Sequence, residues 1–61
     1  MGHQSQLIEK MVARAARNIV WQVREGGLSF EDAVAKVMAG SVCGPATKAD
    51  AIARAAQQVA A

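Results

Sequence analysis

The chain has 61 residues and a formal net charge of +2, and hydrophobic residues make up 52% of it. This length allows one domain, residues 1–61, close to the lower size limit at which a core folds alone. The composition excludes a disordered tail, and no apolar run approaches the ~20 residues that span a bilayer. The mild positive charge permits an acidic partner but does not require one.

The first predicted helix runs from Gln4 to Glu25, a stretch without glycine or proline. Helical spacing places a set of small and branched apolar residues on one stripe, which Met11 flanks. The stripe consists of Ile8, Val12, Ala15, Ala16, Ile19 and Val23. Gly26 and Gly27 end the helix, because glycine adopts the left-handed conformation at a helix C-terminus without steric cost.

The second predicted helix begins after Ser29, whose side chain can cap it, and Asp32 follows three residues later. Apolar residues at helical spacing form its buried face: Phe30, Ala33, Val34, Val37 and Met38. Gly40 ends this helix and opens a loop that runs to Pro45.

The third predicted helix begins near Pro45 or Thr47 and runs to about Ala60. Its inward residues are expected to be Ile52, Ala56 and Val59, with Ala49 and Ala53 beside them. No stretch alternates with the period of two that a strand requires. The sequence therefore predicts an all-α fold of three helices.

The large apolar side chains are few for a domain that must fold alone, since much of the hydrophobic fraction is alanine. Disulfides, metals and self-association are the usual ways to stabilise so small a core. One cysteine excludes an intrachain disulfide, and one histidine excludes a zinc cluster. We therefore expect a homodimer that packs along the first helix through Ile8, Val12, Ile19 and Val23.

Trp21 lies opposite the apolar stripe, on the heptad line of Leu7 and Arg14. Four basic residues gather around it on the polar face: Lys10, Arg14, Arg17 and Arg24. Exposed tryptophan and arginine are enriched at binding hot spots, so this face is the predicted partner-binding surface. The alternative is that Trp21 packs on the third helix or on a second copy, with arginine stems covering the ring.

Nucleic-acid binding is the second functional hypothesis, because basic residues and an aromatic ring suit phosphate contact and base stacking. A helix-turn-helix interpretation would use residues of the third helix: Thr47, Lys48, Arg54, Gln57 and Gln58. The loop before this helix is longer than the turn of three or four residues that the motif uses. Glu9 and Glu25 also flank the basic face of the first helix.

Nothing in the sequence resembles a catalytic constellation. Cys43 has no base within reach along the chain, and the Gly40–Gly44 loop lacks the lysine of a phosphate-binding loop. We expect no enzyme activity, cofactor, metal or small-molecule substrate. The absence of a signal peptide and the lone cysteine favour the cytoplasm. The favoured function is a small interaction protein of bacterial or phage type that binds a larger protein and modulates it, for example as an inhibitor.

Overall fold

The computed structural model describes residues 3–40 and 44–61, and these residues form three α-helices and no strand. Helix α1 spans His3–Arg24, α2 spans Phe30–Ala39 and α3 spans Pro45–Ala60. The predicted all-α fold of three helices is confirmed, with α1 placed within a residue of its expected ends. The thiol of Cys43 lies outside the described residues.

The helix ends use the capping residues that the sequence indicates. Ser29 is the N-cap of α2, and its hydroxyl oxygen accepts a hydrogen bond from the Asp32 backbone amide at 3.1 Å. Gly27 has a φ of 71°, the left-handed conformation expected after α1. Helix α3 begins directly at Pro45, after Gly44 as N-cap, so Thr47 lies inside its first turn and does not cap it.

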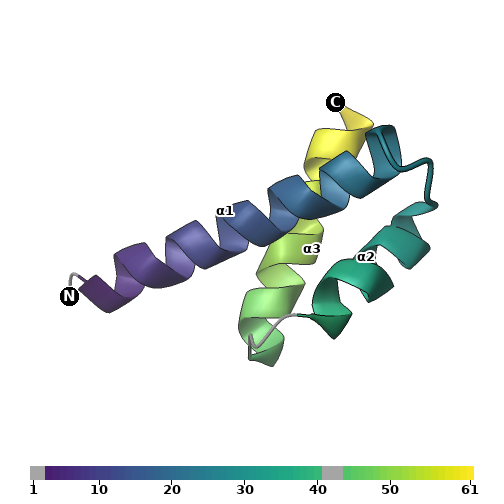
Figure 1. Cartoon of the computed structure of the whole chain (residues 1–61). Helices are drawn as coiled ribbons and strands as arrows, with labels where there is room; N and C mark the ends of the chain where they lie inside the picture. The colour runs from purple at the N-terminus through teal and green to yellow at the C-terminus, as the bar shows by residue number, and fades with distance from the viewer. Residues whose placement is uncertain (1–2, 41–43) are drawn as a thin grey trace.

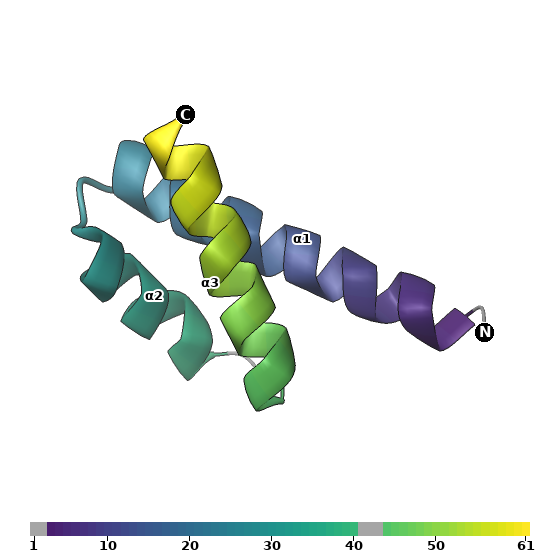
Figure 2. The same ribbon diagram turned by 180° about the vertical axis from the view of Figure 1, so that it is seen from behind.

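Helix α1 is the central element of the fold. Both α2 and α3 pack against it, whereas α2 and α3 contact each other little. Figures 1 and 2 show α3 crossing α1, with α2 beside the C-terminal part of α1, while the N-terminal end of α1 extends beyond both. The molecule is therefore elongated, with principal extents of 38 × 24 × 16 Å.

The core is small and rich in alanine. Its buried residues come from all three helices: Val12, Ala16, Ile19, Val20, Ala33, Ala51 and Ala55. Val12 and Ile19 are the largest side chains that are fully buried. Half-buried apolar residues of α2, such as Phe30 and Val34, pack around this centre. Alanines at the contacts let the helices approach closely, at the cost of buried apolar area.

The predicted stripe of α1 is confirmed at Val12, Ala16 and Ile19 but is wrong at Ile8. Ile8 is 49% exposed and is not part of the buried core. Burial within the single chain also leaves little of the predicted dimer seam accessible. Val12 and Ile19 are enclosed in the chain's own core and Val23 is half-buried against it, so only Ile8 of the four remains on the surface.

The predicted inward face of α3 is also corrected. Ala51 and Ala55 are the buried residues of this helix, whereas Ile52 and Val59 are half-buried at the edges. The three alanines that were expected to point inward are exposed: Ala49, Ala53 and Ala56. Small side chains therefore occupy the centre of the α1–α3 contact, where they allow the two helix backbones to approach closely.

Candidate interaction surface on α1

Trp21 is 56% exposed and does not belong to the hydrophobic core. Within the single chain, the ring is therefore not enclosed between α1 and α3. The neighbouring Arg17 and Arg14, which lie about one turn and two turns back along α1, are exposed as well. Trp21 thus lies on the open side of α1, surrounded by arginine side chains, as the partner-binding hypothesis requires.

An exposed line of residues runs along α1 directly opposite the core. Its members are spaced alternately four and three residues apart: Leu7, Met11, Arg14, Asn18 and Trp21. At about 100° per residue they occupy a narrow arc on the far side from Val12 and Ala16. We call these five residues the outer line. Together with Ile8, three of them are the exposed large hydrophobic residues of the described chain: Leu7, Met11 and Trp21.

Positive charge borders the outer line on one side only. Lys10, Arg17 and Arg24 follow one another at intervals of seven residues along this side, and all three are exposed. We call them the basic flank. The side chain of Arg24 reaches α3, where its Nη2 donates a hydrogen bond to the carbonyl oxygen of Gln58 at 2.9 Å. Lys10 and Arg17 are therefore the more accessible members of the flank.

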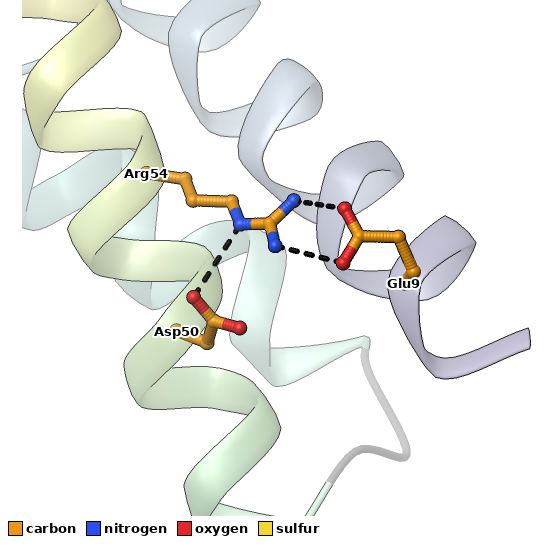
Figure 3. A network of polar contacts seen from close by, with 3 residues as sticks. All are labelled: Glu9, Asp50 and Arg54. Atoms are coloured by element: carbon orange, nitrogen blue, oxygen red, sulfur yellow. Dashed lines mark hydrogen bonds and ion pairs between the residues drawn. The ribbon is translucent and has the colours of Figure 1, made fainter. Parts of the chain in front are cut away.

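Of the two acidic residues beside this surface, Glu25 is exposed just after the end of α1, whereas Glu9 is held by α3. Arg54 donates hydrogen bonds from both terminal nitrogens to the carboxylate of Glu9, one of them from Nη2 to Oε1 at 2.8 Å, as Figure 3 shows. The Arg54 Nε lies 3.4 Å from Oδ1 of Asp50 on the same helix. This bidentate contact ties α3 to the N-terminal half of α1. It also neutralises Glu9, so that this carboxylate offsets little of the charge of the basic flank.

The Arg54 hydrogen bonds lower the pKa of the Glu9 carboxyl below its ordinary value. A carboxyl whose pKa is lower in the folded than in the unfolded chain stabilises the fold above its unfolded-state pKa, and this contribution disappears as the pH falls through the folded-state pKa. We therefore expect Glu9→Gln to destabilise the fold at pH ~7 and to match the wild type at pH ~2. Urea unfolding at the two pH values measures this difference, which solvent exposure keeps small.

An equal effect of Glu9→Gln at both pH values would contradict this assignment, since it would show that charge is not involved. Glu31→Gln is a suitable control because Glu31 is an exposed carboxylate outside the network.

The α3 residues proposed for nucleic-acid contact do not form one accessible set. Arg54 is engaged by Glu9 and Asp50, and Thr47 and Lys48 are half-buried. Gln57 and Gln58 are exposed. The weak contact between α2 and α3 also differs from the packed helix pair of a helix-turn-helix motif.

A shallow groove of about 330 Å³ lies between α2 and α3, lined by Phe30, Glu31, Val34, Ala35 and Ile52. Glu31 is its one titratable residue, so the groove lacks the convergent polar groups of an active site.

Within residues 3–40 and 44–61, no group of three histidine, cysteine or acidic residues could hold a metal ion. None of the helices in this part of the chain has the length and apolarity to cross a bilayer. Comparison with protein-family models, curated proteins and solved structures finds no match for the chain.

Proposed function

We propose that the chain is a small non-catalytic interaction protein that binds a larger protein and modulates it. The contact surface in this proposal is the outer line together with the basic flank of α1. The observation that carries it is Trp21, which is 56% exposed among exposed arginines in a fold whose core is complete without it. Tryptophan and arginine are the residues most enriched among binding hot spots.

The solvent-exposed area of the molecule also supports a binding partner, because it is larger than expected for a compact monomer of this mass. A compact monomer of 6.4 kDa is expected to expose about 3,800 Å², whereas this chain exposes 4407 Å². The excess of roughly 600 Å² approaches the ~800 Å² that each partner buries in a standard protein interface. The N-terminal end of α1 extends beyond α2 and α3 and provides part of this area.

A photo-crosslinking residue in place of Arg17 tests the proposal in cells that naturally contain the protein. We expect a discrete polypeptide adduct that disappears when Trp21 is also replaced by alanine. The same crosslinker in place of Lys36, which is exposed on α2, should give no such adduct. Adducts with nucleic acid alone would instead support the alternative, a small DNA-binding regulator that uses the basic face of α1. The absence of any adduct at Arg17 would contradict both.

We also propose that the chain self-associates. Because Val12 and Ile19 are buried in the core, the outer line is the apolar surface of α1 available for a dimer. Coiled-coil geometry predicts which residues of the two copies would face each other. In an antiparallel pair, Arg17 would face Arg17 of the second copy and Lys10 would lie near its Arg24. In a parallel pair, Arg14 would face Arg14. Either arrangement places like charges side by side, so the dimer is expected to be weak.

We expect this weak dimer to become stronger as salt is added. Screening lengths fall from about 30 Å at 0.01 M salt to about 3 Å at 1 M, which reduces the repulsion between arginines. Sedimentation equilibrium should give a mass near 6.4 kDa in low salt and a larger mass in high salt. Arg17→Gln should dimerise more readily in low salt and depend less on salt. A tight dimer in low salt would contradict the assignment of the outer line as the seam.

A further inference from the structure

We propose that the outer line and basic flank of α1 bind an acidic amphipathic helix of the partner protein. This inference rests on the proposed function and specifies the kind of partner segment that the surface fits. Three properties of α1 support this inference. The residues of the outer line have the spacing of a helix-packing surface, the basic flank lies on one side of that line only, and all residues of both sets are exposed.

The spacing of the outer line indicates a helix as the occupant. Alternating intervals of four and three residues give an average repeat of 3.5, the repeat with which one helix packs along another. Leu7, Met11 and Trp21 provide apolar side chains at both ends of the line. The distance from Leu7 to Trp21 along the helix axis is about 21 Å, enough for two heptads of a second helix.

The basic flank indicates the charge of that helix. Lys10, Arg17 and Arg24 occupy one heptad position beside the outer line, where side chains of paired helices meet and select partners by charge. The opposite flank carries no charge and consists of Ile8, Ala15 and Gln22. A partner helix with glutamate or aspartate at its flanking positions would oppose this row of cations, whereas a basic helix would be repelled.

The other occupants fit this surface less well. A second copy of the chain would bring arginines against arginines in both orientations. Duplex DNA would contact the cations but would leave the heptad line of Leu7, Met11 and Trp21 without a function. An acidic amphipathic helix would cover the apolar side chains of the outer line and also pair its carboxylates with the basic flank.

Two synthetic helical peptides of about three heptads provide the test. Both have leucine at the positions that face the outer line, and their flanking positions carry glutamate in one and lysine in the other. Titration of the full chain, followed by Trp21 fluorescence, should show binding of the glutamate peptide with affinity at least about tenfold higher than that of the lysine peptide. Binding of a random DNA duplex with higher affinity than the glutamate peptide would overturn the proposal.

Charge reversal on the chain supplies the matched controls. Arg17→Glu should lower the affinity for the glutamate peptide and raise it for the lysine peptide, whereas Lys36→Glu makes the same change of charge on α2 and should leave both affinities unchanged. Equal binding of the two peptides, or binding of neither, would overturn the acidic-helix proposal. If crosslinking at Arg17 still yielded a polypeptide adduct, the chain would bind a larger protein as proposed, and only the assignment of an acidic helix as the bound segment would be wrong.

Discussion

Replacing Ile19 by alanine is expected to lower the free energy of unfolding by about 2–5 kcal/mol. Ile19 is fully buried where α1 meets the other helices, and among the described residues only one other large side chain, Val12, is buried as completely. Proteins are stable by roughly 0.05–0.15 kcal/mol per residue, which gives this chain about 3–9 kcal/mol in total. The substitution should therefore unfold a large part of the population, as circular dichroism during urea titration would measure.

Ile8→Ala is the matched control, because it makes the same change on the same helix at a position that is 49% exposed. We expect it to cost about 1 kcal/mol or less, since little buried area is lost. If Ile8→Ala destabilised the chain as much as Ile19→Ala, both side chains would have to be buried in solution. That result would indicate a tight association through the N-terminal half of α1, contrary to the weak dimer expected here.

The number and ends of the helices could be predicted because local sequence determines them. Ser29 caps α2 through its own hydroxyl group, and Gly27 adopts the left-handed conformation that stops α1. Pro45 begins α3 because its fixed backbone suits a first helical turn. Each of these signals acts over a few residues, so its effect does not depend on how the helices are arranged.

The orientation of α3 could not be predicted because its apolar residues are mostly alanine. The six alanines from Ala46 to Ala56 are spread over more than half of the helix circumference, so hydrophobic periodicity locates the centre of the buried face poorly. Because Ile52 and Val59 are the largest apolar side chains of α3, the sequence predicted a buried face centred on them. The observed face is centred on Ala51 and Ala55, since close approach to α1 requires small side chains at the centre of the contact.

The candidate surface was predicted in part. Trp21 and the surrounding cations follow from helical spacing alone, because the core stripe fixes which side of α1 faces outward. Met11 was expected to flank the core stripe, yet it is 38% exposed and belongs to the outer line. The pairing of Glu9 with Arg54 joins residues 45 positions apart, so only the packing of α3 on α1 reveals it.

Trp21→Ala is expected to weaken binding of the glutamate peptide about thirtyfold or more, which corresponds to ~2 kcal/mol. The indole is the largest side chain of the outer line, and a helix laid along this line would cover the 56% of it that is exposed in the single chain. The wild-type emission should shift to the blue on adding the peptide, as water is removed from the ring. Because the variant lacks the only tryptophan, its affinity is measured by anisotropy of a labelled peptide.

The stability of the same variant separates a binding role from a structural one. An exposed side chain outside the core contributes little to folding, so Trp21→Ala should change the free energy of unfolding by no more than about 0.5 kcal/mol. Gln57→Ala, an exposed position on α3, is the control and should change neither stability nor affinity. A large loss of stability in Trp21→Ala would show that the ring is packed within the fold or in a dimer. If a fully folded Trp21→Ala chain bound the peptide with unchanged affinity, Trp21 would not belong to the contact surface. Truncating a side chain that the peptide buries would remove contact area and would therefore lower the affinity.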